Sequence, residues 1–134
     1  MGRKARILIL DDERIVCERL RPTVEKLGFE VETFTSSTEA LARLAEQRFD
    51  VMVTDLKMPG PGGLDVLRFV KENHPRTKVI VITGFATVET AREALKGGAV
   101  DFFPKPFKMS ALRELIVKLA ADLPVDEPST SPEK

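Results

Sequence analysis

Short apolar runs alternate with longer stretches of helical periodicity, and this alternation constrains the fold more than any other feature of the chain. Three runs are rich in β-branched residues and too short for helices: Arg6–Leu10, Val51–Thr54 and Lys78–Thr83. They lack the in–out alternation of a half-exposed strand, which is typical of strands buried on both faces of a parallel sheet. We predict two more strands, at Asp101–Phe103 and at the more polar Glu30–Phe34, which is typical of a sheet edge.

Between the strands, apolar residues recur every three to four positions, as they do in amphipathic helices. Pro22 is expected to remove one backbone hydrogen bond from the first helix and to bend it. Ser36 and Thr87 are predicted N-caps, and His74 is predicted to lie at an exposed helix end. The positions expected to face inward are Val16, Leu20, Val24, Leu27, Leu41, Leu44, Leu64, Leu67, Val70, Val88, Ala91, Ala94, Leu95, Met109, Leu112, Leu115, Ile116, Leu119 and Leu123. Five strand–helix units predict an α/β fold with a parallel sheet and right-handed crossovers.

Length and charge narrow the class of protein. A chain of 134 residues fits one domain, which we expect to span residues 1–123, and Pro-rich residues 124–134 are expected to form a disordered tail or linker. Lys plus Arg and Asp plus Glu number 21 each, so no net charge favours direct nucleic-acid binding. No apolar run is long enough for a membrane helix and no secretory signal begins the chain, which predicts a cytoplasmic protein. The single Cys17 is expected to be a buried or half-buried helical residue.

Charged and hydroxyl side chains stand where the predicted strands end. Asp11 and Asp12 follow the first strand, Asp55 the third, Thr83 the fourth and Lys105 the fifth. Ligands of open α/β sheets bind outside the carboxyl ends of the strands, so these side chains are expected to meet in one site. Three carboxylates repel one another, and a hard divalent cation such as Mg²⁺ would relieve that repulsion. With Mg²⁺ and one ammonium present, a carboxylate such as that of Asp55 can act as a nucleophile and accept a phosphoryl group.

These residues resemble those of a known family, the receiver domains of two-component response regulators. The resemblance is carried by Asp11-Asp12, Asp55-Leu-Lys-Met-Pro-Gly60, Thr83-Gly84 and Lys105-Pro106-Phe107, and it covers roughly residues 5–123. It implies a flavodoxin-like (βα)5 doubly wound sheet of strand order 2-1-3-4-5. It also implies a signalling switch that catalyses only its own phosphorylation and dephosphorylation, with a histidine kinase or phosphotransfer protein as its partner.

The resemblance also implies a role for each residue. Asp55 would be the phosphoacceptor, and Thr83 and Lys105 would bind phosphoryl oxygens. Mg²⁺ would be held by Asp55, Asp12, Asp11 acting often through water, and the backbone carbonyl of Lys57. The Lys105–Pro106 peptide would be cis.

In such a switch, Thr83 would move toward the phosphoryl group and Phe102 would turn inward to fill the gap, although Phe102 could equally be an ordinary core residue. This movement would change the face made by the fourth helix, the fifth strand and the fifth helix, where an output domain, a downstream protein or a second copy could bind after phosphorylation. Lys57 and Phe85 would flank the route of the attacking water, and we expect bulky Phe85 to slow loss of the phosphoryl group. Gly84 and Pro106 would border the pocket.

Two other functions use related chemistry or the same fold. A haloacid-dehalogenase-like phosphatase also forms an aspartyl phosphate, but it places a second Asp where this chain has Lys57. A flavodoxin-like FMN-binding module needs a hydroxyl- and Gly-rich loop after the first strand, whereas Asp11-Asp12-Glu13 would repel the FMN phosphate. Within the receiver interpretation, the chain could be a stand-alone regulator or part of a longer transcription regulator. The run Thr83–Glu89 resembles receivers that precede ATPase-type transcription activators.

Overall fold

The computed structural model describes residues 4–121, and five strands alternate strictly with five helices along that part of the chain. Residues 124–134, predicted to be a tail or linker, and Leu123 lie outside it. The elements are β1 (Arg6–Leu10), α1 (Arg14–Glu25), β2 (Glu30–Phe34), α2 (Ser37–Glu46), β3 (Val51–Asp55), α3 (Gly63–Asn73), β4 (Lys78–Thr83), α4 (Val88–Lys96), β5 (Asp101–Pro104) and α5 (Met109–Ala121).

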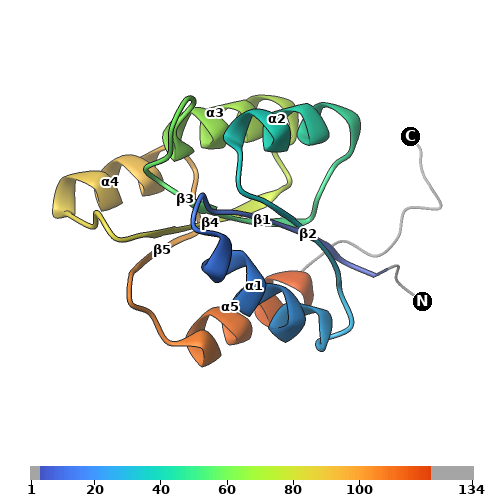
Figure 1. Ribbon diagram of the computed structural model, residues 1–134. Helices are drawn as coiled ribbons and strands as arrows, with labels where there is room; N and C mark the ends of the chain where they lie inside the picture. Colours follow the sequence, from blue (N-terminus) through green and yellow to red (C-terminus); the bar gives the residue numbers. More distant parts are fainter. Residues whose placement is uncertain (1–3, 122–134) are drawn as a thin grey trace.

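All strand pairs are parallel, and the sheet has the order β2-β1-β3-β4-β5. Helices α2, α3 and α4 cover one face of the sheet, and α1 and α5 cover the other (Figure 1). The predicted flavodoxin-like architecture and strand order are therefore confirmed, including the placement of the polar strand β2 at one edge.

Each buried strand supplies side chains to two separate cores, which is why its sequence is apolar throughout. In β1, Ile7 and Ile9 join the core under α1 and α5, whereas Leu8 and Leu10 join the core under α2, α3 and α4. All four side chains are fully buried. Successive residues of a strand point to opposite faces, so a strand that lies between two helical layers has no polar side.

Local signals set the helix boundaries as predicted. The Ser36 hydroxyl accepts a hydrogen bond from the Glu39 backbone N–H, and the Thr87 hydroxyl accepts one from that of Thr90. Pro22 is accommodated inside α1, which runs on to Glu25 as one helix. Cys17 is buried in α1, as expected, and its Sγ lies 3.5 Å from the carbonyl oxygen of Asp11.

Two sequence predictions about burial are wrong. Val88 and Leu95 were expected to face inward, but they are 75% and 49% exposed, because only Ala94 of α4 is fully buried against the sheet. His74 was expected at an exposed helix end, but it is half-buried, and its Nε2 lies 2.7 Å from the carbonyl oxygen of Leu44. This contact joins the end of α3 to α2.

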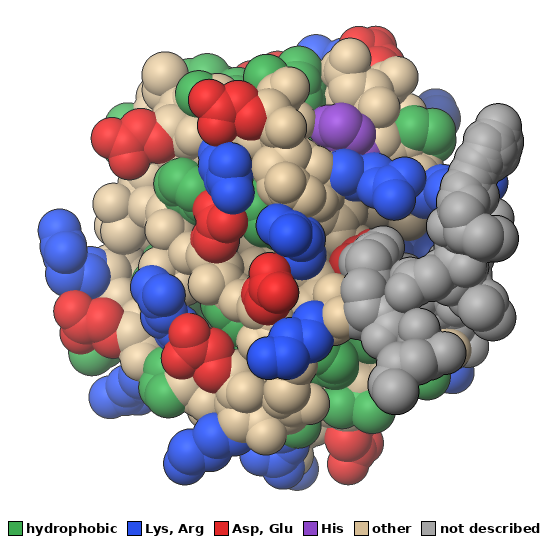
Figure 2. Space-filling view, turned by 90° about the vertical axis from the view of Figure 1, so that its right-hand side faces the viewer, with side chains coloured by type: hydrophobic (Ala, Val, Ile, Leu, Met, Phe, Trp, Pro, Cys, Tyr) green, Lys and Arg blue, Asp and Glu red, His purple; other side chains and the backbone are tan. Residues whose placement is uncertain are grey.

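The surface carries both signs of charge. Figure 2 shows Lys and Arg side chains interspersed with Asp and Glu on the face it presents, in keeping with the balanced composition. Within residues 4–121, no helix is both long enough and apolar enough to cross a membrane.

Candidate functional site

The predicted site residues meet at the carboxyl edge of the sheet. Asp11 directly follows β1, Asp55 and Thr83 are the last residues of β3 and β4, and Lys105 directly follows β5. The side chains of Asp11, Asp55 and Thr83 are buried although they are polar. Burial of polar groups is costly unless they are paired, so an unpaired carboxylate at this edge would be unfavourable without a cation.

The three aspartates are arranged as a metal site requires. One carboxylate oxygen from each of Asp11, Asp12 and Asp55 lies within 4.8 Å of the others, with Asp12 exposed and the other two buried. Asp11 Oδ2 is buried and receives no well-aligned hydrogen bond within the described chain. Oxygen ligands of this number and charge, open to solvent on one side, are what Mg²⁺ prefers. The residues present therefore fit a divalent cation.

The ammonium of Lys105 partly neutralises this carboxylate cluster. Its Nζ lies 2.8 Å from Asp11 Oδ2, 2.9 Å from Glu13 Oε1 and 3.4 Å from Asp55 Oδ2. Burial disfavours the charged ammonium, but the bonds to Asp11 and Glu13 outweigh it and raise the pKa of Lys105. Burial also raises the pKa of Asp11, against the lowering effect of Lys105. The Lys105 ammonium thus lies within 3.4 Å of three carboxylates, those of Asp11, Glu13 and Asp55.

The two carboxylate oxygens of Asp55 have different partners. Oδ1 accepts a hydrogen bond from the Leu56 backbone N–H at 2.7 Å, while Oδ2 faces Lys105. The first residue of α3, Gly63, packs against this segment so closely that a Cβ there would collide with the Asp55 carbonyl oxygen and lie 2.7 Å from Leu56 Cα. Glycine at this position therefore lets α3 begin directly beside the end of β3.

Thr83 and Phe102 lie on neighbouring strands. The Thr83 hydroxyl is fully buried and accepts a hydrogen bond of 3.0 Å from the backbone N–H of Phe85. Phe102 is half-buried and packs against the core under α2, α3 and α4. Thr83 pairs with Pro104 in the β4–β5 ladder, so Phe102 lies two residues from the register position of Thr83.

Lys57 follows β3 and Phe85 follows β4, and their side chains contact each other across the two loops. The Lys57 Nζ lies 5.5 Å from the centroid of the Phe85 ring, which is within the range of a cation–π contact. Both side chains are exposed, as are Gly84 and Pro106. The Lys105–Pro106 peptide bond is cis, as the resemblance implied.

Glu13 is the one residue of this cluster to which the sequence analysis gave no role at the site. It occupies the N-cap position of α1, yet its side chain makes no capping hydrogen bond and reaches Lys105 instead. Glu is an uncommon N-cap compared with Ser, Thr, Asp or Asn. A glutamate at an N-cap position directly after two aspartates was the signal that could have identified Glu13 as a site residue.

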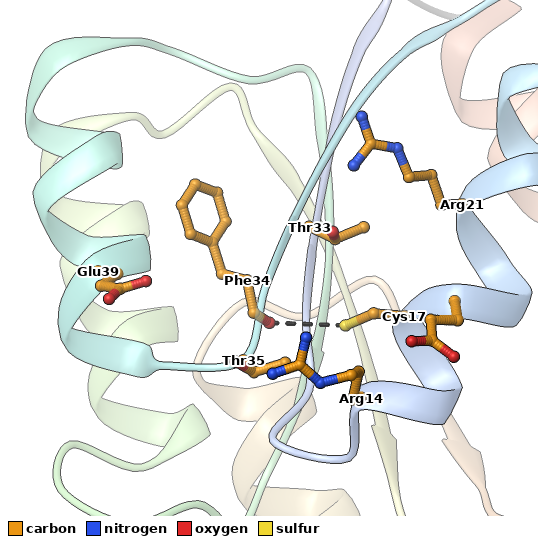
Figure 3. A pocket seen from close by; sticks show the side chains of 8 residues that line it. Arg14, Cys17, Arg21, Thr33, Phe34, Thr35 and Glu39 are labelled. Carbon is orange, nitrogen blue, oxygen red and sulfur yellow. Dashed lines mark hydrogen bonds between the residues drawn. The ribbon is translucent and has the colours of Figure 1, made fainter.

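A second hollow lies away from this cluster, between α1 and β2. Its volume is about 260 Å³, and Figure 3 shows Arg14, Cys17 and Arg21 of α1 opposite Thr33 and Phe34 of β2. It contains none of the predicted site residues. Two arginines and two glutamates line it, so its charge favours neither an anion nor a cation.

The fold and the cluster together define a class of protein: a (βα)5 domain with an acidic pocket, whose residues fit a divalent cation, at the carboxyl edge of its sheet. Comparison with known sequences specifies the family. Residues 7–117 match the response regulator receiver domain, and the chain belongs to that family. It is therefore a signalling module whose phosphorylation drives a switch in a two-component system, rather than an enzyme that turns over a separate substrate, and such a domain has a histidine kinase as partner.

Individual relatives agree with this membership. The chain is 36% identical over 113 residues to the response regulator protein PilR of Pseudomonas aeruginosa, a match that covers 84% of this chain and 25% of PilR. Among solved structures, a CheY-like receiver domain from Methanospirillum hungatei JF-1 superposes with a TM-score of 0.85 at 29% identity, covering 90% of this chain and 96% of that one.

A second solved structure is the beryllofluoride-activated NtrC4 receiver domain dimer. It gives a TM-score of 0.82 at 36% identity, covering 87% of this chain and 97% of that one. The present chain thus matches receiver domains nearly end to end, but spans only about a quarter of the length of relatives such as PilR.

Proposed function

We propose that Asp55 accepts a phosphoryl group from a phosphohistidine of the partner kinase or of a phosphotransfer protein. An Asp55 carboxylate oxygen attacks phosphorus as the phosphorus–nitrogen bond breaks. The histidine nitrogen leaves with the bonding electron pair and is protonated, and an acyl phosphate remains on Asp55. The observation that carries this proposal is the burial of Asp55 beside two further aspartates with its Oδ2 3.4 Å from the Lys105 ammonium.

Asp11, Asp12, Asp55 and the backbone carbonyl of Lys57 would hold Mg²⁺. The ion, when bound, neutralises charge on the transferred phosphoryl group. The three carboxylates supply oxygen ligands, and the buried Asp11 Oδ2, which lacks a well-aligned hydrogen bond within the described chain, supports this assignment.

Lys105 and Thr83 would each bind a phosphoryl oxygen. The Lys105 ammonium already lies beside Asp55 and remains positively charged because its carboxylate neighbours raise its pKa. The Thr83 hydroxyl accepts from the Phe85 backbone N–H, so its own proton is available to a phosphoryl oxygen. In-line positioning and charge neutralisation are most of what phosphoryl transfer requires.

Movement of Thr83 would then drive the switch. Its displacement toward the phosphoryl group leaves space that the half-buried ring of Phe102 can fill, which would alter the α4–β5–α5 face. Val88 and Leu95 expose apolar surface on α4, and Val100 exposes it just before β5. An output domain, a downstream protein or a second copy would bind there after phosphorylation. Phe102 has no phenolic hydroxyl, so packing alone would set its two positions.

Lys57 and Phe85, joined by their cation–π contact, would control access of water to the phosphorylated Asp55, with Gly84 and Pro106 bordering the pocket. The receiver domain would span residues 1–123, and residues 124–134 would be a tail or linker. The match to only about a quarter of the length of PilR supports placement of this chain in a longer cytoplasmic regulator.

Phosphorylation of the intact chain with phosphoramidate and Mg²⁺ tests the proposal. We expect intact-mass spectrometry to detect one added phosphoryl group in the wild type and none in Asp55→Asn. Asp65→Asn, at an exposed carboxylate in the first turn of α3, is the matched control and should still be modified. An adduct that persists in Asp55→Asn, or no adduct in the wild type, would contradict the assignment of Asp55.

A further inference from the structure

The Glu13 side chain does not cap α1 and instead contacts Lys105 in the pocket. As the N-cap residue of α1 it could satisfy a free backbone N–H with its carboxylate, but it makes no such bond. Its side chain, 59% exposed, instead reaches across 92 positions of sequence to Lys105, 2.9 Å away. Ordering an exposed side chain costs conformational entropy. Because the Glu13 side chain does not stabilise the helix by capping it, we look for its effect on the pocket.

The contact between Glu13 and Lys105 occupies one of the Lys105 N–H donors that a phosphoryl group could use. A lysine ammonium has three N–H donors, and three carboxylates, those of Asp11, Glu13 and Asp55, lie within 3.4 Å of Lys105 Nζ. Glu13 and Asp55 accept hydrogen bonds from this ammonium, so a phosphoryl oxygen that binds Lys105 competes with them for its donors. Asp11 is fully buried and would be left uncompensated, whereas the exposed Glu13 is free to turn into water.

Glu13 also changes the charge balance of the pocket. Mg²⁺ and Lys105 together balance the three aspartates, so the Glu13 carboxylate is one negative charge in excess. That charge is largely exposed to solvent and lies 2.9 Å from the Lys105 Nζ that is proposed to bind a phosphoryl oxygen. Repulsion from it grows with the negative charge on the donor.

We propose that Glu13 is a specificity-determining residue for phosphoryl transfer to Asp55. Its carboxylate holds Lys105 until a phosphoryl oxygen replaces it, and its charge discriminates against phosphodonors that carry a second negative charge. This inference rests on the role proposed above for Asp55. Glu13 acts by holding the Lys105 side chain and by repelling negatively charged donors, without contacting the reacting atoms, so it is a positioning residue.

Two small phosphodonors of different charge test the proposal. Acetyl phosphate is a dianion at neutral pH, and phosphoramidate is mainly a monoanion. In both reactions an Asp55 oxygen attacks phosphorus, and either acetate or ammonia leaves with the electron pair of the broken bond. The rate constant for adduct formation is measured for each donor at saturating Mg²⁺ by intact-mass spectrometry, since the chain has no Trp or Tyr to serve as a fluorescent reporter.

We expect Glu13→Gln to accelerate phosphorylation by acetyl phosphate more than that by phosphoramidate. The ratio of the two rate constants should rise about threefold, the size expected for two unit charges several ångströms apart at a solvent-exposed site. Raising the salt concentration to about 0.15 M should reduce the difference, because screening weakens the repulsion in the wild type. A purely structural role for Glu13 would change both rates alike.

Two further variants sharpen the result. Glu13→Asp keeps the charge and should retain the wild-type ratio. Glu18→Gln makes the same charge change on the exposed surface of the same helix, at a side chain that lines the hollow between α1 and β2, and should leave the ratio unchanged. A ratio in Glu13→Gln that matches Glu18→Gln, or that falls below the wild-type ratio, overturns the inference while leaving Asp55 as the acceptor. Absence of any adduct in the wild type would instead overturn the proposed function, and this inference with it.

Discussion

At the scale of single residues, the pocket is arranged so that charged groups differ in their freedom to move. Asp11 and Asp55 are buried and tied to the backbone N–H groups of Glu13 and Leu56. The Lys105 side chain is 16% exposed and shared among carboxylates. Because the buried groups are fixed, changes in the reactivity of the site should come from exposed residues at its rim.

Phe85 is exposed, and we propose that its ring lies at the rim of the site. Phe85→Ala removes the contact with Lys57 and opens the approach of water, so we expect the phosphoryl group to be lost about two- to fivefold faster, as expected when a contact worth about 0.5–1 kcal/mol is removed. The decay is followed by mass spectrometry after the donor has been removed. Val88→Ala removes exposed apolar surface at the first residue of α4 and leaves the contact between Lys57 and Phe85 in place, so it should decay like the wild type. An unchanged or slower decay in Phe85→Ala would contradict this role.

At the scale of the elements, an ion pair connects β2 to α2. Arg43 Nε and Nη2 donate to the two carboxylate oxygens of Glu32 at 2.8 and 2.9 Å, in the forked geometry that suits a guanidinium. The hydrogen bonds from Arg43 lower the pKa of Glu32, with burial opposing them. A carboxyl group whose pKa is lowered in the folded state stabilises the protein above its unfolded pKa.

Replacement of Glu32 should therefore lower the free energy of unfolding by an amount that depends on pH. We expect Glu32→Gln to lower the free energy of unfolding by about 0.5–1 kcal/mol at neutral pH, the upper part of the range for partly exposed pairs. The difference from the wild type should vanish as the pH falls through the lowered pKa of Glu32, where the wild-type carboxylate is protonated as well. Urea unfolding followed by circular dichroism at neutral and acid pH measures it.

Glu46→Gln, at a more exposed carboxylate that contacts the same arginine, is the control. It should lower the free energy of unfolding by less than Glu32→Gln does. A Glu32→Gln penalty that is constant with pH would show that the ion pair is not its source.

Most elements could be predicted from sequence because their local signals agree with their tertiary setting. The strands β1 and β4 were predicted residue for residue, because continuous β-branched runs buried on both faces have no competing interpretation. The N-caps Ser36 and Thr87 were predicted because their hydrogen bonds are local.

Other features depend on neighbours that the sequence does not reveal. Periodicity marks Val88 and Leu95 as apolar positions, but α4 packs on the sheet mainly through Ala94, so both remain exposed. Asp11, Asp55 and Lys105 could be grouped because each stands at a strand end, and parallel strands end together. The contact between Glu13 and Lys105 could not be predicted, since it depends on which way a side chain turns at a helix start.

At the scale of the whole molecule, we expect the exposed apolar residues on α4 to take part in association after phosphorylation. The solved NtrC4 receiver was studied as a beryllofluoride-activated dimer. We expect the present chain to shift toward a dimer when treated with beryllofluoride and Mg²⁺, and Leu95→Glu to prevent that shift because it introduces a charge into a half-exposed apolar position. Analytical ultracentrifugation with and without beryllofluoride measures the change.

Ile15→Glu makes the same change at an exposed apolar position on α1, on the opposite side of the sheet, and should still dimerise. Dimerisation of Leu95→Glu that equals the wild type would show that α4 is not part of the interface.

The division of the interior into two cores has a consequence for how this fold can diversify. The two cores lie on opposite faces of the sheet, because Ile7 and Ile9 point one way and Leu8 and Leu10 the other. Substitutions beneath α4 can therefore accumulate without loosening the packing of α1 and α5, and the free-energy costs of substitutions in the two layers should add. A lineage can thus remodel its output helix while the opposite half of the domain stays as it was.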